Sequence, residues 1–202
     1  MGYKTMFLAL GGLMIASYAK VAVGVSQLDV SHNALHRVER LIDLGKIDEG
    51  YSTAFENLKL EVLSTGDAAY RATLSQVANT SGSARKIELL MDANAKPVAD
   101  DFKVIEGDEP ANAPGWPDKS ASDVAASALH HIEHVGKPEY QPFVDAMSAF
   151  TLSQTGSGNS LRGVLTISAP GTTDKLIVTV TGSGDMDGDP VVKKEQDGDV
   201  QP

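Results

Sequence analysis

Two stretches of eight residues, 94 positions apart, carry the same pattern of apolar and polar side chains. Residues 34–41 read ALHRVERL and residues 128–135 read ALHHIEHV. In both stretches the apolar residues recur at spacings of three and four, which is typical of a helix that buries one face. The sequence therefore predicts the same amphipathic helix twice.

The resemblance between the two halves continues beyond these helices. The matching positions, in chain order, are Gly45-Lys46 with Gly136-Lys137, Arg71 with Arg162, and Lys86-Ile87 with Lys175-Leu176. Chance similarity would not preserve the order, the spacing and the type of element together. We therefore predict a unit that has been duplicated within the chain.

Each unit is expected to contain a helix, a short second helix or ordered loop, and then antiparallel strands. We expect the first helix to run from about His32, capped by Asp29 or Ser31, and the second to be capped by Ser120 or Ser122. Glycines should end both helices, and these are Gly45 and Gly136. Alternating apolar residues predict strands over 58–62, 69–77, 86–91, 97–105, 150–152, 161–167 and 175–181, with 191–192 at most a last edge strand.

The predicted fold class is α+β, with two tandem repeats that each place a three- to four-stranded meander after the helix. The first repeat covers residues 28–106 and the second 118–192. Residues 107–117 form a linker rich in proline and glycine, and its Trp116 should pack against the second repeat. Because each sheet covers only one face with its own helix, we expect a pseudo-twofold pair, either with the sheets joined or with the helices facing.

The chain ends carry features of their own. Residues 1–24 combine Lys4, an apolar run over 6–15 and small residues after it, which is typical of an export signal. The alternative is an uncleaved anchor over residues 5–24, and either one predicts a periplasmic or extracellular protein. Residues 193–202 should be a disordered acidic tail. The acidic pattern at 185–189 resembles the start of a calcium loop, but Gln196 stands where such a loop needs a bidentate carboxylate.

The overall charge and composition exclude several classes of function. A net charge of -10 argues against partners made of nucleic acid and against anionic membranes. The absence of cysteine excludes disulfides and thiolate chemistry. Because no nucleophile elbow, metalloprotease helix or phosphate loop occurs, we expect a non-enzymatic interaction module of the periplasm or cell envelope, with an unknown protein or peptide partner and no cofactor.

All five histidines lie on the two matching helices. His32 with His36, and His130 with His134, are four residues apart, so each pair projects from one helical face. Glu39 and Glu133 follow three residues after His36 and His130 and could supply oxygen ligands. The alternative function is therefore a zinc- or copper-binding or metal-sensing protein that uses His130, His134, Glu133, His36 and His32.

A plainer interpretation of the histidines is a solvated polar face. Arg37 and Arg40 stand in the first helix where His131 and His134 stand in the second. Two ligands on one helix are also an incomplete set for a tetrahedral ion. A shared metal site therefore requires that the fold bring the two helices together.

Overall fold

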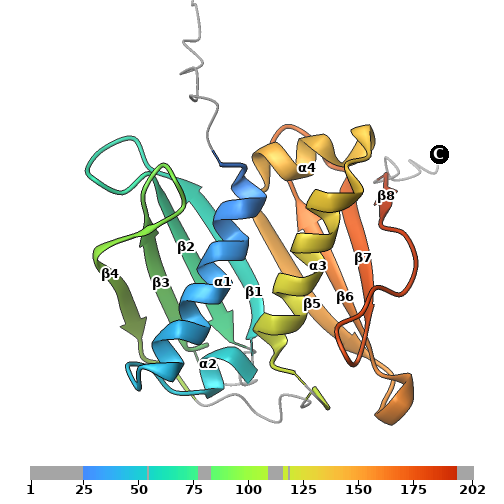
Figure 1. Ribbon diagram of the computed structural model, residues 1–202, viewed down its shortest axis with the longest axis horizontal. Coiled ribbons are helices and arrows are strands. Elements are labelled where there is room, and N and C mark those ends of the chain that lie inside the picture. Colours follow the sequence, from blue (N-terminus) through green and yellow to red (C-terminus); the bar gives the residue numbers. More distant parts are fainter. Residues whose placement is uncertain (1–24, 54, 77–82, 109–115, 118, 195–202) are drawn as a thin grey trace, which may run out of the picture.

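A computed structural model describes residues 25–53, 55–76, 83–108, 116–117 and 119–194. Within these ranges the fold is α+β and has two layers: one antiparallel sheet, and helices packed on one of its faces (Figure 1). The elements in chain order are α1 (Gln27–Asp43), α2 (Gly50–Thr53), β1 (Phe55–Val62), β2 (Tyr70–Gln76), β3 (Lys86–Met91), β4 (Pro97–Ile105), α3 (Ala121–Val135), η1 (Pro138–Tyr140), α4 (Gln141–Ala146), β5 (Ala149–Thr155), η2 (Gly158–Ser160), β6 (Arg162–Ser168), β7 (Lys175–Thr181) and β8 (Val191–Lys193).

The sheet has eight strands in the order β4-β3-β2-β1-β5-β6-β7-β8. Strands β1 to β4 pair successively, as do β5 to β8, and the two sets join where β1 pairs with β5, with Leu58 opposite Phe150. The helices α1 and α3 lie side by side on the same face and run in opposite directions (Figure 1). Of the two arrangements expected for the helices and sheets, the sheets are thus joined and the helices are also neighbours.

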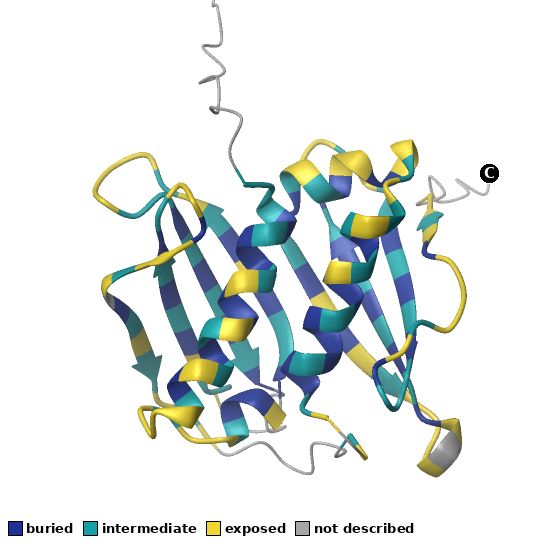
Figure 2. Cartoon of the chain, in the orientation of Figure 1, coloured by how far each residue is buried: buried dark blue, intermediate teal, exposed yellow. Residues whose placement is uncertain are grey.

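The core lies between the sheet and these helices, as the dark blue bands of Figure 2 show. Strands β6 and β7 alternate between buried and half-buried residues along their whole length, because successive side chains point to opposite faces. Leu58 and Leu60 lie on the buried face of β1. Val62 ends β1 and is 59% exposed, whereas the two leucines are buried.

Helix α1 begins earlier than predicted. Ser26 is its N-cap, and the backbone N–H of Asp29 donates to Ser26 Oγ at 3.0 Å while the N–H of Ser26 donates to Asp29 Oδ2 at 3.1 Å. This reciprocal capping satisfies backbone donors that the first turn leaves free. Asp29 and Ser31, expected as caps, therefore lie inside the helix.

Helix α3 agrees with the sequence more closely. Ser120, one of the two expected caps, accepts a hydrogen bond from the N–H of Asp123. Gly136 ends the helix with a left-handed backbone, φ 58°, which glycine adopts without strain. Both predicted boundaries of this helix are confirmed.

Trp116 lies where the linker meets the second half of the chain. It is partly buried and packs on the core, and its Cη2 would lie 2.5 Å from a Cβ placed on Gly163 of β6. The tryptophan thus anchors this end of the linker, as expected. The predicted export signal at 1–24, most of the linker and the tail beyond Lys194 fall outside the described residues. None of the described helices is long and apolar enough to cross a membrane.

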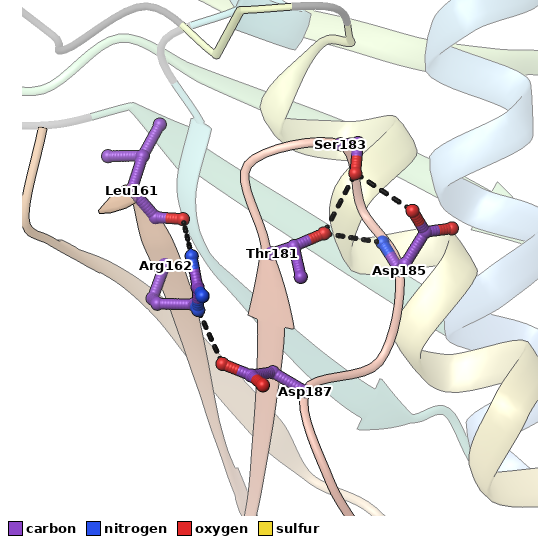
Figure 3. Close-up of polar contacts among 6 residues, drawn as sticks. All are labelled: Leu161, Arg162, Thr181, Ser183, Asp185 and Asp187. Atoms are coloured by element: carbon purple, nitrogen blue, oxygen red, sulfur yellow. Dashed lines mark hydrogen bonds and ion pairs between the residues drawn. The ribbon is translucent and has the colours of Figure 1, made fainter. Parts of the chain in front are cut away.

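The acidic segment between β7 and β8 does not gather its carboxylates around one point. Asp185 accepts a hydrogen bond from Ser183 Oγ, and Asp187 pairs with Arg162 (Figure 3). Asp189 pairs with Lys137 at 2.9 Å. The three carboxylates therefore have separate partners. Beyond them, β8 pairs with β7 as the predicted edge strand.

Candidate metal centre

Four histidines form a continuous row across the seam between α1 and α3. Nε2 of His36 lies 3.0 Å from Nε2 of His32, one helical turn away. The ring of His32 is 5.6 Å from the ring of His130 on the other helix, and the rings of His130 and His134 are 4.2 Å apart. The antiparallel packing of the two helices thus joins two pairs that are almost a hundred residues apart in sequence.

The two central histidines of this row, His32 and His130, form a trio of possible ligands with Glu133. One ligand atom from each lies within 4.8 Å of the other two. Around a tetrahedral ion with bonds of about 2.0–2.1 Å, two ligand atoms lie about 3.3 Å apart. The limit of 4.8 Å is wider than this spacing, so the three side chains would have to move closer together to hold an ion.

Of the five sequence-predicted ligands, the four histidines form the row and Glu133 lies beside it. His36 and His134 flank the trio, next to His32 and His130 respectively. His131, one of the two positions where the second helix departs from the first, interacts instead with the charge of Asp189.

Two hollows border the trio on different sides. His32, His36 and His130 line a shallow hollow of about 280 Å³, together with Asp123, Ala126 and Ser127. Glu133 lines a second hollow of about 430 Å³, which it shares with Asp29 at the start of α1. His36, His130 and His134 are exposed, whereas His32 and Glu133 are half-buried. An ion from solvent can therefore reach the imidazoles directly.

Burial and neighbouring charges shift the protonation of the half-buried groups. Burial, aided by the imidazoles of His36 and His130, lowers the pKa of His32 to about 4. His32 is therefore neutral at pH 7 and keeps the lone pair that a metal ion requires.

Glu133 is shifted in the opposite direction. Burial, together with hydrogen bonding to Asp29 and the charge of that carboxylate, raises the pKa of Glu133 to about 8. Burial alone would raise the pKa of Asp29, but hydrogen bonds with Glu133 and Ser26 outweigh it and hold this pKa below its usual value. Oε1 of Glu133 is buried and has no hydrogen-bond partner among the residues that the structure describes.

Glu39, the other carboxylate considered from sequence, lies at the opposite end of the seam. Its Oε1 accepts hydrogen bonds from the hydroxyls of Ser52, Ser120 and Ser122. These residues come from α2, from the N-cap of α3 and from its first turn. Glu39 therefore ties three segments together and is not among the grouped metal-ligand candidates.

The environments of both glutamates are absent from the sequence-based predictions, which place Asp29 as a helix cap and give Ser52 no role. A signal was available, because Ser26 precedes Asp29 by three residues, as Ser120 precedes Asp123. This spacing places a capped helix start in each half, and antiparallel packing then puts each start beside the glutamate of the other helix.

The donor set favours borderline transition metals. Two imidazole nitrogens and one carboxylate oxygen suit zinc, copper or nickel, whereas calcium and magnesium prefer oxygen ligands alone. Comparison of the chain with protein-family models, with curated proteins and with solved structures gave no match. A proposal for the function therefore has to rest on the geometry and chemistry of the residues themselves.

Proposed function

We propose that this protein binds a divalent transition-metal ion between α1 and α3, with His32, His130 and Glu133 as ligands. The observation that carries the proposal is the cross-helix trio, whose ligand atoms lie within 4.8 Å of one another. Solvated histidines on a polar face have no need to converge from two helices. Zinc and copper are the ions that this mixed nitrogen and oxygen set suits best.

Calorimetric titration with zinc, copper and nickel tests the proposal. The wild-type protein should bind one ion tightly, and the variant His32→Ala/His130→Ala should lose at least about 100-fold in affinity, since it lacks two of three ligands. The matched control is His131→Ala, which removes an imidazole from the same helix but outside the row and should bind like the wild type. Equal binding by all three proteins, or no binding by any, would contradict the proposal.

The second proposed function is the interaction module expected from sequence. It is supported by the sheet face opposite the helices, which none of the described elements covers (Figure 1). Thr151 and Thr166 stand opposite each other on that face, on neighbouring strands. A pull-down from an envelope fraction should return a partner that the variant Thr151→Glu/Thr166→Glu fails to retain. Identical recoveries by both proteins would count against an interaction through this face.

We also propose that the chain arose by internal duplication and that it is exported. The duplication is supported by the order of elements, since a helix precedes four successive strands in each half. Export is supported by the composition of residues 1–24. Sequencing the N-terminus of the protein recovered from cell fractions tests export, because an intact Met1 in the cytosolic fraction would contradict it.

A further inference from the structure

We infer that an ion bound at this site keeps one coordination position open toward the hollow of about 280 Å³ between α1 and α3, where it takes water or a small monodentate anion. This inference rests on the proposed metal binding and concerns what the bound ion can do. It follows from the number of protein ligands, from the side on which they lie and from the position of His36.

The number of ligands leaves the coordination sphere incomplete. The trio supplies two nitrogens and one oxygen, whereas zinc in a structural site takes four protein ligands. Three protein ligands with a fourth position for solvent are the pattern of sites whose ion remains reactive.

The arrangement of the ligands places the open position on one side. His32 and His130 line the smaller hollow, while Glu133 lines the larger one together with Asp29. Glu133 therefore approaches the ion from the side away from the smaller hollow. The space in front of the two imidazoles is large enough for several water molecules, since each occupies about 30 Å³ in the liquid.

His36 lines this hollow as well, and its contact with His32 gives it a role other than filling the open position. Its Nε2 lies 3.0 Å from Nε2 of His32, within hydrogen-bond distance. A hydrogen bond through one ring nitrogen of a metal-binding histidine fixes its tautomer and orientation, so His32 would bind the ion through Nδ1. His36 is exposed and lies outside the trio, so we assign it as a positioning residue for His32.

Cobalt(II) absorption with azide tests the inference. Cobalt(II) added to the full chain should produce visible absorption bands, and azide should then shift these bands in a saturable way. Bands that form but do not respond to azide would overturn the open position and leave the proposed metal binding intact. If no bands form, the proposed function itself fails.

The variant His36→Ala separates the two roles of this histidine. As a positioning residue, its loss should weaken cobalt affinity by about 10- to 100-fold and leave the azide response in place. If His36 instead fills the fourth position, azide will shift the bands of His36→Ala alone and leave those of the wild type unchanged. His131→Ala, which should match the wild type in both measurements, controls for the loss of an imidazole.

Discussion

At each end of the α1–α3 seam, a glutamate of one helix lies beside the start of the other helix. The surroundings of the two glutamates differ. At one end Glu39 of α1 lies beside the start of α3, and its carboxylate accepts hydrogen bonds from three serine hydroxyls. At the other end Glu133 of α3 lies beside the start of α1, where it faces Asp29 and has one buried oxygen without a partner in the described chain.

The difference lies in what surrounds each carboxylate. Ser122 donates to Glu39 from the first turn of α3, whereas the apolar Leu28 is buried in the first turn of α1. A carboxylate with three donors stabilises the fold, while a carboxyl group facing another acid gains little from its position. We therefore infer that Glu39 holds the helices together and that Glu133 is available to an ion.

The largest expected effect is a difference in the free energy of unfolding between variants of the two glutamates. If this difference were absent, the proposed contrast between them would be wrong. Glu39→Ala should cost about 3 kcal/mol, because three hydroxyls lose their charged acceptor. Glu133→Ala should cost less than about 1 kcal/mol, because it removes a group with few favourable contacts. Urea unfolding of the metal-free variants measures both values. Equal losses in the free energy of unfolding would show that the two glutamates stabilise the fold to the same extent.

The next largest effect is the stabilisation of the folded protein by a bound metal ion. An ion that binds only the folded protein should stabilise it by about 2.7 kcal/mol at a free concentration 100 times its Kd. The gain should survive in Glu39→Ala, which keeps the whole trio, and should vanish in His32→Ala/His130→Ala. Thermal unfolding with and without zinc measures it. A gain that disappears in Glu39→Ala would place the ion at the wrong end of the seam.

The smallest effect is the pH dependence of the metal-free protein. Because the pKa of Glu133 rises from 4.5 to about 8 on folding, the folded state holds an extra proton in this range and stability falls as pH rises. The pKa of His32 falls from 6.5 to about 4, so its contribution rises with pH between these values and offsets the first. Between pH 6.5 and 8 the contribution of His32 is nearly constant, whereas that of Glu133 still falls.

Urea midpoints measured from pH 6.5 to 8 test this sign. They should decline in the wild type and decline less in Glu133→Gln, which mimics the protonated acid at every pH. The two proteins differ only at residue 133, so contributions from all other groups cancel in the comparison. Parallel curves for the two proteins would contradict the raised pKa.

The order and type of the elements could be predicted from sequence because they depend on local periodicity. Strands β3, β4 and β7 lie where alternation placed them, and Gly136 ends α3 as expected. The start of α1 could not be placed as well, because Asp29 suits both a cap and the third helical position. The hydrogen bonds between Asp29 and Ser26 show that Ser26 is the cap and that Asp29 is the third helical residue.

The histidine pairs of the candidate site could be predicted from the sequence, but their convergence from two helices could not. The spacing of His32 with His36 and of His130 with His134 follows from helical geometry alone. Their convergence depends on α1 and α3 packing side by side and antiparallel, and the sequence left that arrangement open. The contact of Glu133 with Asp29 follows from the same packing, so no local pattern could reveal it.

The most direct test of the central claim is the location of the ion in crystals of the full chain grown with zinc. Anomalous scattering should show one peak about 2.0–2.1 Å from a ring nitrogen of His32 and of His130, and about 2.0–2.2 Å from a carboxylate oxygen of Glu133. A peak held by His130 and His134 of α3 alone, or no peak along the seam, would contradict a site shared between the two helices.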